Sequence, residues 1–259
     1  MTDVREVAAD MRAEQEALDA VVAGLTDDRW ALATPSPGWS VADQIGHLTY
    51  FDGAAATAIV DPAGFADQVA QLVSTEDRDA LTLHRHLSPP ALLAAWRANR
   101  RRLAEAAATL ADDTRVAWYG PSMGAKSFLT ARLMECWAHG QDVVDALGVE
   151  RPATDRLRHV ARLGVITRGW SYANRGLELP PGEVRVELAG PGGARWCFGP
   201  DDAAGVVAGP ALDFCLVVTQ RRHVDDTALR VTGEIARDWM ERAQAFAGPA
   251  TDGPAPRSA

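Results

Sequence analysis

The spacing of apolar residues changes once along the chain, at the sequence LPPGE (Leu179–Glu183). Before this point, apolar side chains recur every three or four residues in several long stretches, which is the period of an amphipathic helix. After it, Val184, Val186 and Leu188 alternate with polar or small residues, which is the period of a strand. The chain is therefore expected to be mainly α, with an antiparallel helical bundle followed by a small α+β domain.

Turn residues bound the expected elements. Ser40 and Asp43 are typical of a helix start, and Pro89 and Pro90 suit the first turn of another helix. Helices are expected at 4–25, 41–59, 90–110, 127–148 and 154–175, with short helical pieces and loops at 61–88. A hairpin is expected at 184–198, and two further helices at 210–221 and 235–246. The predicted domains are a bundle at 1–178, an α+β domain at 180–248 and a disordered Pro/Gly/Ala-rich tail at 249–259.

The composition argues against a nucleic-acid-binding protein and against a membrane-spanning one. The formal net charge is −9, and no stripe of basic residues is interleaved with aromatic ones, so nucleic acid is not an expected partner. No run approaches the roughly 18 apolar residues of a membrane span, and the charged N-terminus does not resemble a signal peptide. The three cysteines, Cys136, Cys197 and Cys215, form no CxxC pair. These features predict a soluble cytoplasmic protein with reduced thiols, either a monomer or a homodimer.

Three residues form a candidate metal site. Glu135 and His139 are four residues apart in MECWAHGQD, so both lie on one face of a helix. His47 lies in another expected helix, between Ile45 and Leu48. Two imidazoles and one carboxylate leave a fourth position open, which is typical of catalytic metal sites. The alternative is that His47 is an ordinary core histidine and that the bundle binds no metal.

Two sequence motifs carry a family resemblance. TPSPGWSVADQIGHL, which follows the turn DDRW at Asp27–Trp30, ends with His47 and Leu48, and RLMECWAHGQDVVDALG contains Glu135 and His139. In this order, the two motifs resemble those of the DinB/YfiT-like metal-binding bundles, and especially of the mycothiol-dependent maleylpyruvate isomerase family. The resemblance implies a DinB-like antiparallel four-helix bundle, here with an extra helix at 154–175. It also implies that His47, Glu135 and His139 are the metal ligands.

The C-terminal part resembles the same family less closely. Family members have a small α+β domain there, with a helix followed by a Gly-Arg-like segment that supplies an arginine to the active site. GPALDFCLVVTQRRH occupies that place, so Arg221 is the candidate catalytic residue and Arg222 the alternative. Gln220 stands where the family has glycine. The two arginines could instead only end a helix, where cations interact favourably with the helix dipole.

The resemblance implies a zinc-dependent enzyme that uses a thiol, mycothiol, as an S-transferase or isomerase on a small unsaturated or electrophilic substrate. Zinc suits two histidines and a glutamate, although Ni²⁺, Fe²⁺ or Mn²⁺ can also occupy such a site. The alternative function is non-catalytic binding of a metal or small ligand.

Several neighbouring residues have two interpretations each. Asp142 could orient a metal ligand or face water, and Trp39 and Trp137 could anchor the core or line the site. His84 and His86 could form a surface metal clip or lie on a solvated loop. Cys136 points about 100° away from Glu135 on an ideal helix, which favours a structural thiol.

Overall fold

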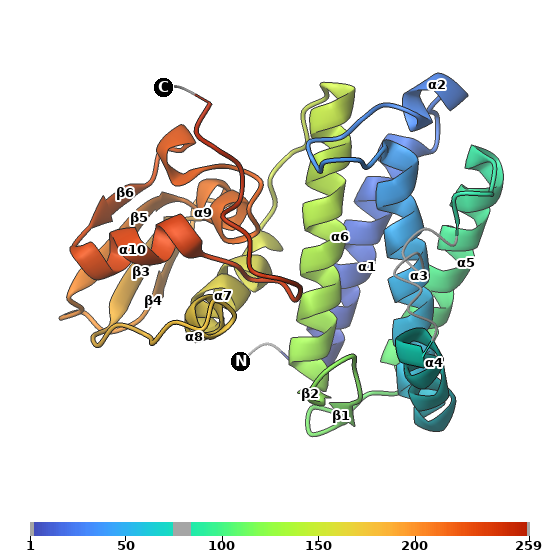
Figure 1. Ribbon diagram of the computed structural model, residues 1–259, viewed down its shortest axis with the longest axis horizontal. Coiled ribbons are helices and arrows are strands. Elements are labelled where there is room, and N and C mark those ends of the chain that lie inside the picture. The colour runs from blue at the N-terminus through green and yellow to red at the C-terminus, as the bar shows by residue number, and fades with distance from the viewer. Residues whose placement is uncertain (1–2, 75–83, 258–259) are drawn as a thin grey trace. The chain divides into compact units, whose positions relative to one another are not determined.

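The computed structural model describes residues 3–74 and 84–257, and the chain divides into two compact units, Met1–Glu150 and Arg151–Ala259 (Figure 1). The second unit begins earlier than the sequence predicts, at residue 151 instead of 180. The reason is that the segment after Arg151 packs within the second unit. The buried thiol of Cys215 donates to the carbonyl oxygen of Leu157, and the backbone N–H of Gly192 donates to Asp155. Across the described residues, no helix is both long and apolar enough to cross a membrane.

The first unit is a four-helix bundle, as the sequence predicts. Its helices are α1 (Val4–Val22), α3 (Val41–Val60), α5 (Pro89–Ala107) and α6 (Ala125–Leu147). Helix α3 contacts α5 and α6, and α1 contacts the same two helices, so the four enclose one core (Figure 1). The smaller elements are α2 (Asp27–Trp30), α4 (Pro62–Ser74) and a hairpin of β1 (Arg115–Val116) and β2 (Met123–Gly124).

Local sequence explains where the site-bearing helices begin and end. Ser40 and Asp43 form a capping box at the start of α3, each side chain bonding the backbone N–H of the other residue. Helix α6 ends at Gly148, whose φ of 64° is in the left-handed region that glycine adopts without strain. Between the helices, Ile45, Leu48 and Trp96 are completely buried. Packing of these side chains fixes α3 against its neighbours.

The single helix expected at 154–175 is two helices, α7 (Leu157–Ile166) and α8 (Arg168–Ala173). Thr167 separates them with ψ near 9°. Its hydroxyl donates to the carbonyl oxygens of Leu163 and Gly164, which competes with continued backbone bonding at this turn.

The rest of the second unit is a four-stranded sheet with helices. The strands are β3 (Val184–Ala189), β4 (Arg195–Phe198), β5 (Gly205–Pro210) and β6 (Arg230–Thr232), in the order β4-β3-β5-β6. The β3–β4 hairpin is antiparallel, as predicted, whereas β3 and β5 are parallel and β5 and β6 antiparallel. The remaining helices are α9 (Ala211–Val218), the 3₁₀ turn η2 (Val224–Asp226) and α10 (Glu234–Arg242). Phe214 and Trp239 pack edge to face in the core of this unit.

The tail forms neither helix nor strand through residue 257, but hydrogen bonds tie it to the second unit where the sequence predicts disorder. The backbone N–H of Arg257 donates to Asp226, and that of Thr251 donates to Gln244. Gln220 also bonds the backbone carbonyl oxygen of Thr251. Two of these partners, Asp226 and Gln220, are 31 residues from the tail residues that they bond, so composition alone does not reveal them.

Candidate metal centre

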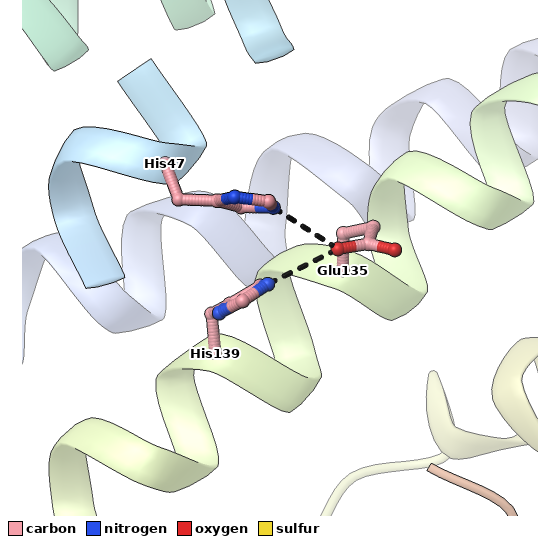
Figure 2. Close-up of side chains that lie close together, drawn as sticks. All are labelled: His47, Glu135 and His139. Carbon is pink, nitrogen blue, oxygen red and sulfur yellow. Dashed lines mark hydrogen bonds and ion pairs between the residues drawn. The ribbon is translucent and has the colours of Figure 1, made fainter. Parts of the chain in front are cut away.

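The three predicted ligands come together in the first unit. His47 projects from the middle of α3, while Glu135 and His139 project from α6, one turn apart (Figure 2). The Nε2 atom of His47 lies 3.4 Å from Oε2 of Glu135, and Nε2 of His139 lies 3.1 Å from the same oxygen. The three candidate ligand atoms all lie within 4.8 Å of one another. Among the described residues, this is the only group of three His, Cys, Asp or Glu side chains that could hold a metal ion.

The spacing of these atoms fits a small tetrahedral cation. Zinc binds nitrogen and oxygen at about 2.0–2.1 Å, so neighbouring ligand atoms of a tetrahedral site are about 3.3 Å apart. Two of the three separations, 3.1 and 3.4 Å, are close to that value, and the third is at most 4.8 Å. The side chains of His47, Glu135 and His139 are 13%, 22% and 12% exposed, so the group is mostly shielded but not sealed from solvent. Three protein ligands would leave one position of a tetrahedral ion for a ligand from outside.

The ionisation states also suit a cation. Burial acts to raise the pKa of Glu135, but hydrogen bonding and attraction from His139 and His47 outweigh it and hold this pKa well below the usual range. Burial and the neighbouring His139 lower the pKa of His47 to about 4. At neutral pH, Glu135 is therefore a carboxylate and His47 a neutral imidazole, which are the forms that bind metal.

The Nδ1 atoms of the two histidines, on the side of each ring away from Glu135, differ in their hydrogen-bond partners. The Nδ1 atom of His47 is buried and has no hydrogen-bond partner among the described residues. The Nδ1 atom of His139 faces the side-chain oxygen of Gln44 at 2.5 Å. Sequence reasoning missed Gln44, although its place three residues before His47 puts both on one face of α3.

Aromatic rings flank the two histidines. Trp39 stacks on His139 with an interplanar angle of 16° and 5.8 Å between ring centroids. Phe51 lies 4.6 Å from His47, centroid to centroid. Trp39 therefore lines the site, whereas Trp137 is buried in the core, and Phe51 is a second aromatic wall that sequence reasoning missed.

The other residues singled out in the sequence fall in different places. Asp142 is buried and accepts a hydrogen bond from Ser36, so it does not face water. Cys136 is buried in the bundle core, which agrees with a structural thiol. His84 and His86 belong to no group of three candidate ligands among the described residues.

Arg221 and Arg222 lie in the second unit, just after α9. The helix ends in a Schellman motif, in which the N–H of Arg221 bonds the carbonyl oxygen of Leu216 and that of Gln220 bonds Val217. Gln220 has a φ of 59°, and it is the only described non-glycine residue with positive φ. The position where the resembling family has glycine therefore keeps the conformation that glycine favours. Both arginine side chains are half-buried.

Residues 11–144 match the family model described as the mycothiol maleylpyruvate isomerase N-terminal domain. Two uncharacterized proteins from two strains of Mycobacterium tuberculosis are each 49% identical over 252 residues, which cover 96% of this chain and 98% of theirs. A crystal structure of the mycothiol-dependent maleylpyruvate isomerase has a TM-score of 0.57 and 17% identity. That of a histidine-to-alanine mutant has the same TM-score and 16% identity. Each match covers 98% of this chain and 99% of the other, and at this identity they establish the fold.

Proposed function

Since this chain belongs to the mycothiol maleylpyruvate isomerase N-terminal domain family, we propose that it is a metal-dependent enzyme that uses a low-molecular-weight thiol as cosubstrate. Mycothiol is the first thiol to test, and zinc is the first metal. The reaction is an S-transfer or an isomerisation by reversible addition of the thiol to a small unsaturated or electrophilic substrate. Such an addition and its reversal consume no oxidant or reductant. The free thiols of Cys136, Cys197 and Cys215 suit a reducing compartment such as the cytoplasm.

The observation that carries this proposal is the convergence of His47, Glu135 and His139. Their three ligand atoms lie within 4.8 Å of one another, and three protein ligands leave one position of a tetrahedral cation free. In a core, a carboxylate that faces two imidazoles is costly to bury, because all three groups lose their hydration. A divalent cation would offset that cost, so a metal site explains the convergence of these three side chains better than a structural role does.

The proposed ligands would give the centre a positive charge. Glu135 contributes the only formal negative charge, and both histidines are neutral when they bind metal. When bound, a divalent cation supplies Lewis acidity at the open position, where a thiol loses its proton more readily. Trp39 and Phe51 shield the two imidazoles from water and orient their rings.

Arg221 is the proposed substrate-binding residue, with Arg222 as the alternative. A guanidinium holds a carboxylate through two parallel hydrogen bonds, which suits a small acidic substrate. The left-handed turn at Gln220 supports the assignment to Arg221, because the turn fixes the backbone one residue before it.

Metal content is the first test. Purified wild-type protein should hold close to one zinc ion per chain, measured by elemental analysis after dialysis. The variants His47→Ala, Glu135→Ala and His139→Ala should each lose it. The double variant His84→Ala/His86→Ala is the matched control and should retain it, because these histidines belong to no such group. Absence of metal from the wild type, even after reconstitution, would overturn the proposal.

Activity is the second test. Zinc-loaded protein is incubated with mycothiol and maleylpyruvate, and then with a panel of other electrophiles, while loss of substrate is followed. Arg221→Met should raise the KM for an acidic substrate about 10–100-fold, since a charge-assisted hydrogen bond contributes about 1.5–3 kcal/mol. Arg230→Met, which changes an exposed arginine of the same unit, is the control. Metal binding without turnover of any substrate would favour a non-catalytic binding protein instead.

A further inference from the structure

Gln44 connects the metal centre to the turn that precedes α3. Its side chain is completely buried and lies between His139 and Thr34. The oxygen Oε1 faces Nδ1 of His139 at 2.5 Å, and Nε2 lies 2.9 Å from the hydroxyl oxygen of Thr34. Thr34 in turn lies 2.9 Å from the carbonyl oxygen of Trp39, the residue whose ring stacks on His139.

The number of available hydrogens fixes the direction of each hydrogen bond from Trp39 through Thr34 and Gln44 to His139. The carbonyl oxygen of Trp39 can only accept, so the single hydroxyl hydrogen of Thr34 must point to it. The hydroxyl oxygen of Thr34 can then only accept from Gln44, which turns the amide NH₂ toward Thr34. The amide oxygen of Gln44 therefore faces His139 and accepts a hydrogen from Nδ1. A flipped amide would bring its oxygen against a hydroxyl with no hydrogen left to give.

We propose that Gln44, oriented by Thr34, is a positioning residue that holds the proton of His139 on Nδ1 and leaves Nε2 bare toward the metal. Nε2 of His139 is the atom that lies 3.1 Å from Glu135. A metal-bound histidine needs an unprotonated nitrogen, and the partner of its other nitrogen decides which one that is. This inference rests on the proposed metal centre and adds a role for a residue outside the three ligands.

A neutral partner has a further consequence for the centre. An amide oxygen fixes the ring as a carboxylate would, but it adds no negative charge. With Glu135 as the only anionic ligand, a bound divalent cation keeps a net positive charge. That charge favours an anionic fourth ligand such as a thiolate.

The position of the proton can be measured without metal. In metal-free protein with ¹⁵N-labelled histidine, two-bond ¹H–¹⁵N spectra at alkaline pH distinguish a protonated from a bare ring nitrogen. The His139 signals are assigned by their loss in His139→Ala. We expect the wild type to carry the proton on Nδ1 and Gln44→Leu to shift the population toward Nε2. A wild-type proton on Nε2 would overturn the inference.

Zinc affinity, measured by competition with a chromophoric chelator, provides the second readout. Gln44→Leu should weaken zinc binding about 10–100-fold, as is usual when the partner of a metal-bound histidine is lost. Gln44→Glu keeps an acceptor and should retain the Nδ1 proton, and its added negative charge should leave the zinc affinity at least as high as in the wild type. Gln141→Leu is the matched control, because the amide of Gln141 donates to Asp145 on α6. Unchanged affinity in Gln44→Leu would also overturn the inference.

Thr34 provides an independent variant outside the helices. Thr34→Val removes the acceptor that orients Gln44 and should produce a mixture of both His139 tautomers, whereas Thr34→Ser should behave as wild type. A single Nδ1 tautomer in Thr34→Val would contradict the proposed role of Thr34. If the wild type binds no zinc, the proposed function fails, but the spectra of metal-free protein still decide where Gln44 places the proton.

Discussion

Two polar clusters each contain residues of helices α3 and α6, and they differ in how their charges are balanced. The first, the metal triad, consists of His47, Glu135 and His139. The second, the buried ion cluster, consists of Gln15, Asp52, Trp96 and Arg132. Arg132 lies three residues before Glu135 on α6, and Asp52 lies five residues after His47 on α3.

In the buried ion cluster, donors from the protein satisfy the carboxylate. One oxygen of Asp52 accepts from Gln15 at 3.0 Å and from Trp96 at 3.1 Å. The other accepts from Arg132 at 3.1 Å. A cation and two neutral donors from the protein thus surround the carboxylate of Asp52.

In the metal triad, the carboxylate has only imidazoles beside it. Both Nε2 atoms point at the same oxygen of Glu135, and Gln44 faces His139 on the far side of the ring. A fixed cation, Arg132, therefore balances the carboxylate of the buried ion cluster, whereas the carboxylate of the metal triad has no such partner among these residues. Variants of the two clusters should differ accordingly in stability and in metal binding.

Removing the cation of the buried ion cluster should destabilise the protein most. Arg132→Met leaves the carboxylate of Asp52 buried without its charged partner, which costs about 3–5 kcal/mol in the free energy of unfolding. Urea denaturation of metal-free protein measures this change. Arg97→Met is the control: its side chain is 40% exposed and Asp19 keeps Arg100 as a partner, so we expect a loss below about 1 kcal/mol. Equal effects of the two variants would contradict the structural role of the cluster.

Zinc should stabilise the protein through the metal triad alone. At a free zinc concentration 100 times the Kd, binding to the folded state adds about 2.7 kcal/mol to the free energy of unfolding. Thermal unfolding with and without a chelator should therefore differ for the wild type. The two curves should coincide for His139→Ala. A zinc effect that survives in His139→Ala would mean that the ion binds elsewhere.

Glu135→Gln should remove zinc binding with little effect on the metal-free fold. The amide keeps an oxygen that can accept from an imidazole but lacks the negative charge, so the metal-free variant should lose no more than about 1 kcal/mol, the net contribution of one hydrogen bond. The same variant should lose zinc, because it lacks the anionic ligand. Chemical denaturation of the metal-free variant beside Glu135→Ala measures the change. A loss of stability equal to that of Glu135→Ala would show that the negative charge itself stabilises the metal-free fold.

The sequence predicted the bundle better than it predicted either cluster. Helical periodicity and the cap at Ser40 depend on residues close together in the chain, so α3 and α6 begin and end within about two residues of their expected bounds. The link between Asp52 and Arg132 joins residues on different helices, and no spacing rule reveals it. Two of the three residues of the metal triad were visible as a pair four residues apart, but the link to His47 depended on the family resemblance.

The second unit shows the same limit. The β3–β4 hairpin was predicted from strict alternation and a glycine turn. Strand β5, with the sequence GVVAGP, was missed because glycine and proline are typical of turns. Parallel pairing with β3 on one side and antiparallel pairing with β6 on the other overrides that local preference.

A third charged group, a buried Asp19 paired with the half-exposed Arg97 and with Arg100, joins α1 and α5 and should give the smallest effect. Asp19 accepts two hydrogen bonds from Arg97, at 2.8 and 2.6 Å, and pairs with Arg100. The hydrogen bonding to Arg97 and the charges of both arginines lower the pKa of Asp19, although partial burial opposes the shift. A carboxylate with a folded-state pKa below its unfolded value, which is about 3.9, stabilises the fold above that value.

The stabilising effect of Asp19 should therefore be present at neutral pH and be lost as the pH falls from about 4 toward the lower folded-state pKa. Because Arg97 is substantially exposed, the difference between wild type and Asp19→Asn should be only about 0.5–1 kcal/mol at neutral pH. Urea denaturation of both proteins across the acid range measures it, and added salt should reduce it, because solvent ions screen exposed pairs. A difference that grows as the pH falls would mean that the proton binds Asp19 more tightly in the folded state, which would place this group with buried acceptors that lack donors.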